Sequence, residues 1–203
     1  LKKGEALGLV GESGSGKSVT SFAIMSLLPE YARIQGDILL FQKPWLQLSE
    51  AEKNEWRGSK IAMIFQDPLS SLDPCFTIED QISEVIRYHT QTANNKIQEK
   101  VLQVLEQVGI PDPKNRLKSF PHQLSGGMSQ RIMIAMALAA EPEILICDEP
   151  TTALDVTIQK QILDLLKKLR QEKHLSMILI SHDLGLVAEN TDRIAVMYAG
   201  EIV

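Results

Sequence analysis

The chain has 203 residues, of which 44% are hydrophobic and 23% are charged, and its formal net charge is -5. This length and composition fit an ordinary folded domain with its own core and exclude a disordered or fibrous chain. The negative net charge and the lack of any Lys/Arg-rich run argue against a nucleic acid partner.

The two cysteines, Cys75 and Cys147, lie far apart and in no metal-binding spacing. We therefore expect a reducing, cytoplasmic environment and no structural zinc. No apolar run approaches the roughly 20 residues that span a bilayer, and the N-terminus lacks the features of a signal peptide. A membrane role would then come through a partner. The abrupt ends at 1–4 and 200–203 predict a fragment trimmed at both ends.

Short apolar runs alternate with helical patterns in the first part of the chain. The run 6–10 meets a glycine-rich turn and predicts a strand, and 18–28 predicts an apolar helix that stops at Pro29. Two further strands are expected at 38–41 and 61–65. Between them, Ser49 and Glu52 have the spacing of a capping box at the start of a short polar helix.

From about residue 77 to residue 140 the pattern becomes helical. Apolar residues between 97 and 108 follow helical spacing, and Gly109 stands where a C-terminal cap belongs. Another helix is expected over 128–139. We interpret the region as an inserted helical subdomain.

Strand patterns return after this region, at 144–147, 177–180 and 194–197, with a helix expected over 158–171. Continuously apolar strands that alternate with helices predict an α/β fold with a mostly parallel sheet buried on both faces. We expect a discontinuous core of residues 1–68 and 141–203 and a helical subdomain of residues 69–140. No repeat or linker supports a second independent domain.

Residues 11–18 match the phosphate-binding pattern G-x-x-x-x-G-K-S/T, directly after a strand and at the start of a helix. Glycines let backbone N–H groups turn toward phosphates, and the helix N-terminus adds positive potential. Lys17 can reach the outer phosphates and the Ser18 hydroxyl can bind Mg²⁺. A plain glycine turn is the alternative, which the strand and helix context disfavours. We expect ATP to contact Gly11, Glu12, Ser13, Gly14, Ser15, Gly16, Lys17, Ser18 and Val19.

The stretch 144–149 predicts an apolar strand that ends in two adjacent carboxylates, Asp148 and Glu149, and strand ends are where open α/β sheets place ligands. Adjacent strand residues point to opposite sides, so we expect Asp148 to approach a metal bound by Ser18. Glu149 would then face the water that attacks the γ-phosphate. Two solvated acids at a surface strand end are the alternative, which a phosphate loop in the same chain disfavours.

A second possible anion site lies at Leu124-Ser125-Gly126-Gly127-Met128, at the start of an apolar helix. A serine and two glycines at a helix N-terminus can bind an anion. Because the chain already has a complete phosphate loop, a second site makes sense if it caps the nucleotide of another subunit. An ordinary serine N-cap with flexible glycines is the alternative.

Five motifs together, in family order across nearly the whole chain, resemble those of the ATP-binding-cassette (ABC) ATPases. The resemblance implies a RecA-like core of the P-loop nucleoside triphosphatase class with the helical subdomain inserted, and ATP hydrolysis with Mg²⁺. The motifs are the phosphate loop, Leu124 to Gly127, Asp148-Glu149, Ala153-Leu154-Asp155 and Ser181-His182-Asp183.

The resemblance also implies roles for single residues. Gln66 would link the metal, the attacking water and the helical subdomain, and His182 would contact both the nucleotide and its γ-phosphate. Asp155 would connect two active sites across a dimer. The expected catalytic residues are Glu149, His182, Lys17 and Gln66. The expected metal ligands are Ser18, Gln66 and Asp148. The residues expected to contact the nucleotide of the partner are Ser125, Gly126 and Gly127.

Within the family, the stretches 65–74, 128–139, 148–157 and 196–200 are similar to the ATPases of oligopeptide, dipeptide and nickel importers. This similarity implies peptide uptake through permease subunits, supplied indirectly by an extracytoplasmic solute-binding protein. The chain would lie peripherally on the cytoplasmic face of the membrane, paired with a homologous or identical ATPase. Residues 67–78 are the candidate for relaying motion to the permease.

Several alternatives stay open. Nickel or another small solute is an alternative cargo, because selectivity lies in the membrane subunits and the receptor. ABC ATPases of DNA repair would show long heptads or zinc-type cysteine pairs, and those of translation two cassettes in one chain; the sequence has neither. A nucleotide-binding regulator without turnover is disfavoured because Glu149 and His182 are both present.

Overall fold

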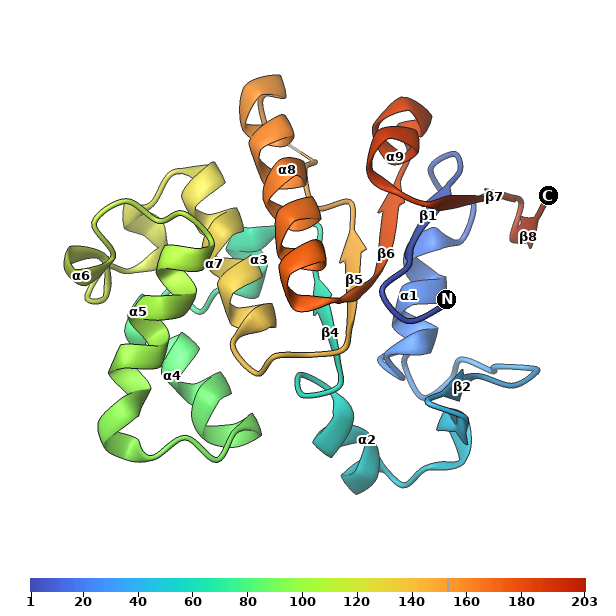
Figure 1. Ribbon diagram of the computed structural model, residues 1–203. Helices are drawn as coiled ribbons and strands as arrows, with labels where there is room; N and C mark the ends of the chain where they lie inside the picture. Colours follow the sequence, from blue (N-terminus) through green and yellow to red (C-terminus); the bar gives the residue numbers. More distant parts are fainter. Residues whose placement is uncertain (153) are drawn as a thin grey trace.

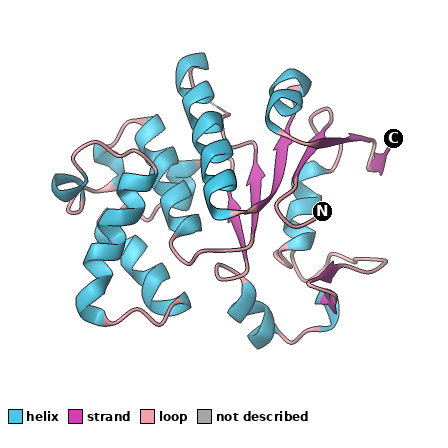
Figure 2. Cartoon of the chain, in the orientation of Figure 1, coloured by secondary structure: helices cyan, strands magenta, loops and turns pink. Residues whose placement is uncertain are grey.

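The computed structural model describes residues 1–152 and 154–203. Within these residues six strands form one sheet in the order β4-β5-β6-β1-β7-β8, and two short strands form a separate hairpin (Figure 2). All neighbours in the large sheet pair in parallel except β8, which is antiparallel to β7. The strands are β1 (Ala6–Val10), β2 (Leu39–Leu40), β3 (Lys43–Pro44), β4 (Ile61–Ile64), β5 (Ile144–Asp148), β6 (Ser176–Ser181), β7 (Arg193–Tyr198) and β8 (Glu201–Ile202).

Some helices pack on the faces of the sheet, and others form a helical region beside one of its edges. In Figure 1, α4 to α7 gather beside β4, whereas the two termini lie near the opposite edge of the sheet. Helix α9 packs on β1 and β6, and α7 packs on β4 and α8. The α-helices are α1 (Lys17–Ile24), α2 (Glu50–Trp56), α3 (Pro68–Ser71), α4 (Ile78–His89), α5 (Ile97–Gln107), α6 (Pro113–Arg116), α7 (Gly126–Leu138), α8 (Val156–Lys173) and α9 (Leu184–Asn190). Short 3₁₀ helices are η1 (Trp45–Gln47), η2 (Asn94–Lys96) and η3 (Pro121–Gln123).

The central strands bury both faces, which explains why their sequences are continuously apolar. On β4, Ile61 and Met63 belong to one apolar cluster, while Ala62 and Ile64 belong to a second cluster on the other face. Because side chains alternate between the two faces of a strand, each face of β4 packs into a different cluster, and both faces are buried. The predicted α/β fold with a mostly parallel sheet is therefore confirmed.

The region between β4 and β5 is helical, as the sequence predicts. Helix α4 begins with a capping box of Thr77 and Asp80, and Ile78, Ile82 and Ile86 are fully buried at a spacing of four residues. Full burial of each such side chain is worth about 1.5–3 kcal/mol. Among the described residues, no helix has both the length and the apolar character needed to cross a membrane.

Helix α1 ends earlier than the sequence predicts. The expected helix runs to residue 28, but α1 ends at Ile24. Ser26 takes a left-handed φ of 52°, and the Leu27 N–H donates to the Phe22 carbonyl at 2.8 Å. This hydrogen bond ends the helix without a glycine at the left-handed position. The sequence therefore contains no residue that signals the end of α1 at Ile24.

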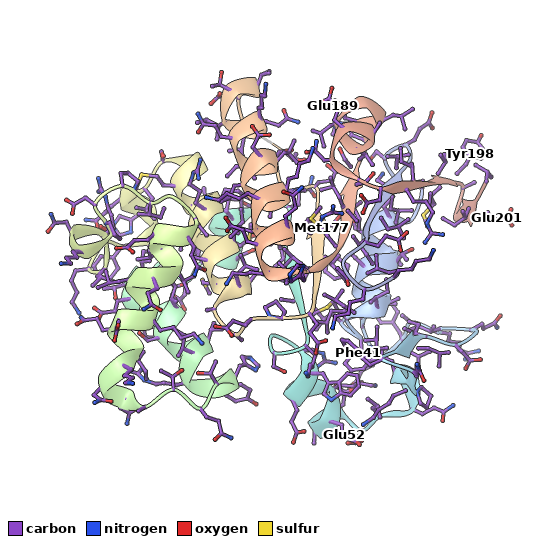
Figure 3. All side chains as sticks on the ribbon, in the orientation of Figure 1. Phe41, Glu52, Met177, Glu189, Tyr198 and Glu201 are labelled. Carbon is purple, nitrogen blue, oxygen red and sulfur yellow. The ribbon has the colours of Figure 1, made fainter. Side chains whose placement is uncertain are left out.

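The expected strand 38–41 does not join the large sheet. Leu39 and Leu40 pair instead with Lys43 and Pro44 in a hairpin. Its two turn residues, Phe41 and Gln42, have φ values of 49° and 63°, the combination found in tight hairpin turns. Figure 3 shows Phe41 in this hairpin and Glu52 in the neighbouring α2. Helix α2 has the predicted Ser49 and Glu52 capping box.

Candidate active site

The loop between β1 and α1 depends on its glycines. Gly14 and Gly16 have φ values of 80° and 106°, in the region that favours glycine. A Cβ on Gly11 would lie 2.2 Å from the Met197 carbonyl oxygen on β7. The loop can therefore turn tightly beside the sheet only with glycine at these positions.

The first turn of α1 has backbone N–H groups that are free to bind a ligand above this loop. Its N-cap is Gly16, which offers no side chain to cap the helix, and the first N–H groups of a helix have no intrahelical acceptor. Lys17 is only 5% exposed, and its Nζ donates to the carbonyls of Gly11 and Glu12 at 2.7 and 2.8 Å. Uncapped N–H groups and an ammonium together form an anion-binding site.

A cavity of about 540 Å³ opens over this loop and brings predicted site residues together from four segments. Four residues expected at the site do not line the cavity: Gly11, Glu12, Ser15 and Asp148. The Ser15 hydroxyl is buried and has no hydrogen-bond partner among the described residues. The cavity is lined by Ser13, Gly14, Gly16, Lys17, Ser18, Val19, Gln66, Glu149 and His182.

Asp148 lies at the end of β5, beneath the start of α1. The Ser18 hydroxyl donates to Asp148 Oδ1 at 3.1 Å, and Asp148 is only 3% exposed. Burial raises the pKa of Asp148 above its ordinary value; the Ser18 hydrogen bond and the charge of Lys17 oppose this shift, and the charge of Glu149 adds to it. A hydroxyl and a carboxylate oxygen side by side fit Mg²⁺, which prefers oxygen ligands.

The described residues contain no cluster of three or more His, Cys, Asp or Glu side chains that could hold a metal ion. Mg²⁺ at a nucleotide site does not need such a cluster, because it is usually held by one or two protein oxygens, phosphates and water. The Ser18 and Asp148 pair therefore fits the ion that the sequence predicts, and its role as a metal site stays a prediction.

Replacing Asp148 by asparagine should raise the melting temperature of the nucleotide-free and metal-free protein at neutral pH. When the pKa of Asp148 is higher in the folded state than in the unfolded state, the protonated side chain contributes its full stability in acid. This contribution is lost as pH rises through the folded-state pKa, so the ionised side chain lowers the stability at neutral pH. Asparagine is neutral at every pH, and its Oδ1 can still accept from Ser18. The gain should therefore shrink on acidification.

Thermal unfolding followed by circular dichroism, from about pH 8 down to about pH 4, measures this difference. Asp164→Asn on the exposed side of α8 is the matched control, which should show no comparable pH-dependent gain. If Asp148→Asn left the melting temperature unchanged or lower at neutral pH, buried charge at Asp148 would not be a cost.

Glu149 does not belong to β5, contrary to the sequence argument from strand alternation. The strand ends at Asp148, and Glu149 has a left-handed φ of 46°. Its side chain nevertheless lines the cavity. The two carboxylates lie where they were predicted, with Asp148 beside Ser18 and Glu149 at the cavity. The reason differs from the prediction, because a bend in the backbone at Glu149, and not the alternation of side chains along a strand, directs them to different places.

One oxygen of Glu149 accepts hydrogen bonds from several segments. Gln66 Nε2 donates to Oε2 at 3.3 Å, and Thr152 Oγ1 donates to it at 2.8 Å. His182 Nδ1 lies 3.3 Å from the same oxygen, and its side chain is 63% exposed. Gln66 thus contacts Glu149 rather than Ser18 or Asp148 in the described contacts, and its metal role stays a prediction.

The hydrogen bond from Thr152 to Glu149 was not predicted from the sequence. The sequence places Thr152 only within a stretch similar to the family, without a role of its own. Its position three residues after Glu149, in a polar turn that follows a strand, is the signal that could have placed its hydroxyl near the carboxylate.

The predicted second anion site lies at a different cavity, of about 590 Å³. Ser125 is the N-cap of α7 and accepts from Met128 N at 3.4 Å, and Asp155 is the N-cap of α8. Ala153 of the same motif lies outside the described residues. The lining is Gly109, Pro111, Ser125, Gly126, Gly127, Met128, Arg131, Leu154, Asp155, Ile158 and Gln161. It shares no residue with the cavity of the phosphate loop.

A parallel sheet, a phosphate loop after β1 and a buried aspartate beside its helix define a fold of the P-loop nucleoside triphosphatase class. The family model described as ABC transporter matches residues 1–152. The chain belongs to this family.

The chain is similar to curated proteins along its whole length. It is 53% identical over 204 residues to the dipeptide transport ATP-binding protein DppD of Escherichia coli (strain K12), and 54% identical over 206 residues to the oligopeptide transport ATP-binding protein OppD of Bacillus subtilis (strain 168). These matches cover 100% of this chain but only 62% and 57% of the relatives, respectively.

Solved structures share the fold. A dimeric post-hydrolysis state of the ATP-binding cassette MJ0796 bound to ADP and Pi matches with a TM-score of 0.86 and 30% identity. That match covers 100% of this chain and 84% of the other. The cbiO1 protein of Clostridium perfringens, part of the ABC transporter complex cbiONQ, matches with a TM-score of 0.84, 28% identity and coverage of 100% and 77%.

Proposed function

We propose that the chain is the ATP-hydrolysing part of an ABC importer that takes up dipeptides or oligopeptides across the cytoplasmic membrane. The observation that carries the proposal is that one cavity joins the phosphate loop to the carboxylate of Glu149. The names of the relatives, which are peptide transport ATP-binding proteins, support peptides as the cargo.

In this proposal the phosphate loop grips the triphosphate. Uncapped N–H groups at the start of α1 bind phosphate oxygens, and Lys17 exchanges its contacts with the Gly11 and Glu12 carbonyls for the outer phosphates. Lys17 is already desolvated and directed over the loop. Little reorganisation is then needed when the nucleotide binds.

Hydrolysis then depends on Glu149. Its carboxylate lines the cavity and can accept a proton from a water that attacks the γ-phosphate in line. Gln66 and His182 lie beside the same carboxylate and can orient the water and the γ-phosphate. Mg²⁺, when held by Ser18 and Asp148, would neutralise charge on the phosphates.

Pairing with a second cassette would complete the site. Ser125, Gly126 and Gly127 face a separate cavity, as expected if they cap the nucleotide of a partner rather than their own. The dimeric state of the structural neighbour MJ0796 supports such pairing. The similarity to importer ATPases favours a homologous partner in a heterodimer, with an identical partner as the alternative.

The contact with permease subunits is proposed at a groove of about 810 Å³ that borders the segment 67–78. The groove combines acidic side chains such as Asp80 and Glu84 with Arg87, and Phe76 and Tyr88 are exposed aromatic residues beside it. A surface of this kind can receive a permease segment with both apolar and charged side chains. Motion at Gln66 would then reach the permease through this segment.

The proposed division is a nucleotide-binding core of residues 1–68 and 141–203 and a helical subdomain of residues 69–140. The proposed location is the cytoplasmic face of the membrane, where the chain would be held by the permease. A solute-binding protein outside the membrane would deliver the peptide to that permease.

Gln81 fixes the loop that forms one wall of the groove. Its side chain is buried, accepts from Asp73 N at 2.9 Å and donates to the Asp73 and Phe76 carbonyls at 2.9 and 3.0 Å. Gln81→Leu keeps the size but removes all three hydrogen bonds. We expect the free energy of unfolding to fall by about 1–3 kcal/mol.

Chemical denaturation measures this loss. Gln103→Leu, at an exposed position of α5, is the matched control and should change stability by less than about 0.5 kcal/mol. Equal stability of the Gln81→Leu and Gln103→Leu proteins would mean that the loop is held by other contacts.

The proposed function is tested by purifying the full-length protein with its bound subunits. We expect membrane permease subunits to copurify, and ATP hydrolysis in proteoliposomes to rise when a peptide-loaded solute-binding protein is added. Stimulation by nickel instead of peptide would contradict the cargo. Copurification with ribosomes or DNA would contradict the transport function itself.

A further inference from the structure

The backbone of Glu149 adopts a left-handed conformation directly after β5. Its φ of 46° lies in a region that residues other than glycine rarely adopt. Two backbone hydrogen bonds hold it there: Glu149 N donates to the Ile180 carbonyl at 3.0 Å, and Thr152 N donates to the Glu149 carbonyl at 3.2 Å. Glu149 is thereby fixed between β6 and a turn that ends at Thr152.

The Thr152 side chain closes the same turn a second time. Its hydroxyl donates to Glu149 Oε2 at 2.8 Å, whereas Gln66 Nε2 and His182 Nδ1 lie 3.3 Å from that oxygen. Thr152 makes the shortest of the three contacts, and it is the only one of the three partners that belongs to the turn of Glu149 itself.

The contacts on Glu149 are unevenly divided between its two oxygens. All three partners named above meet Oε2, and Oε1 has no hydrogen-bond partner among the described residues. A carboxylate held by one oxygen keeps a defined orientation while the other oxygen can accept a proton from water in the cavity. Such an arrangement suits a general base.

We propose that Thr152 is a positioning residue for Glu149, whose hydroxyl holds Oε2 so that Oε1 meets the attacking water. The proposal rests on the proposed function, because it assigns Thr152 to the same hydrolytic step. Thr152 does not line the cavity of the phosphate loop. Its effect should therefore fall on turnover and not on nucleotide binding.

The test compares Thr152→Val, which keeps the β-branched shape without the hydroxyl, with Thr152→Ser, which keeps the hydroxyl. In the full-length protein with its copurified subunits, we expect Thr152→Val to lower kcat for ATP hydrolysis about 10- to 100-fold, with KM and ATP affinity unchanged. Thr152→Ser should stay within about threefold of the unmodified protein. In a Glu149→Gln background, Thr152→Val should cause no further loss, because the base it positions is gone.

Three results would overturn the proposal: a normal kcat in Thr152→Val, equal damage in Thr152→Val and Thr152→Ser, or a further loss in the Glu149→Gln background. If Thr152→Val lowers the melting temperature, Thr152→Ala provides a second variant that lacks the hydroxyl, and the two must share the same kcat defect. Failure of the proposed function is distinguishable, because it would appear as an unmodified protein that does not hydrolyse ATP or is insensitive to Glu149→Gln.

Discussion

Glu149→Gln should lower the rate of ATP hydrolysis at least about 100-fold while ATP binding persists. Glutamine has nearly the same shape, and its carbonyl oxygen can still accept from Thr152 and Gln66. It cannot take a proton from water at neutral pH. ATPase activity and the affinity for a fluorescent ATP analogue, measured on the full-length protein, separate the two effects.

The matched control for this substitution is Glu143→Gln. Glu143 lies just before β5 and pairs with Lys60 at 2.7 Å, far along the strand from the cavity. We expect nearly normal hydrolysis in this control. Normal turnover in Glu149→Gln would remove Glu149 from the mechanism and the positioning role of Thr152 with it.

Ser125→Arg should abolish ATP-dependent pairing and lower hydrolysis by a similar factor, while the isolated chain still binds ATP. Ser125 belongs to the second cavity and not to the cavity of the phosphate loop. A bulky cation at the tip of α7 would block a nucleotide carried by the partner. Equilibrium binding to the isolated chain and analytical ultracentrifugation of the paired cassettes measure the two consequences.

Loss of the helix cap is the competing explanation, and it is worth about 1 kcal/mol. Ser49→Arg removes a comparable N-cap from α2 and controls for that loss. We expect Ser49→Arg to lower stability to a similar extent but to leave pairing intact. If Ser125→Arg also paired normally in ATP, the tip of α7 would have no role between subunits.

The phosphate loop and the alternating strands were predictable because their signals are local. The loop pattern, the apolar run before it and the helix after it all lie between residues 6 and 24. Helix caps such as Ser49 and Gly109 are equally local. The strand order was not predictable, because the buried apolar strands β4, β5 and β6 carry no sequence signal that fixes their neighbours.

The errors in the prediction fall where ordinary side chains take left-handed backbone angles. Ser26 ends α1 early, and Phe41 and Gln42 turn the chain into a hairpin instead of a strand of the large sheet. Glycine or asparagine would have signalled these turns. At Ser26, Phe41 and Gln42, surrounding structure stabilises a conformation that local propensity disfavours.

The candidate site shows the same division. Lys17, Ser18, Gln66, Glu149 and His182 were named from the sequence, and the structure brings them to one cavity. The bend at Glu149 and the Thr152 contact were not predicted, because both depend on a left-handed residue after a strand. The relation of Ser125 to another subunit depends on pairing and stays a prediction.

In the proposed assembly, one triphosphate is held by the phosphate loop of one cassette and by the Ser125 to Gly127 tip of its partner. Vanadate can replace the γ-phosphate in a trapped complex and, under ultraviolet light, cuts the backbone beside it. In the trapped full-length assembly, we expect cuts of this chain within residues 11–18 and also at residues 125–127. Cuts confined to the phosphate loop in every cassette of the assembly would contradict this arrangement.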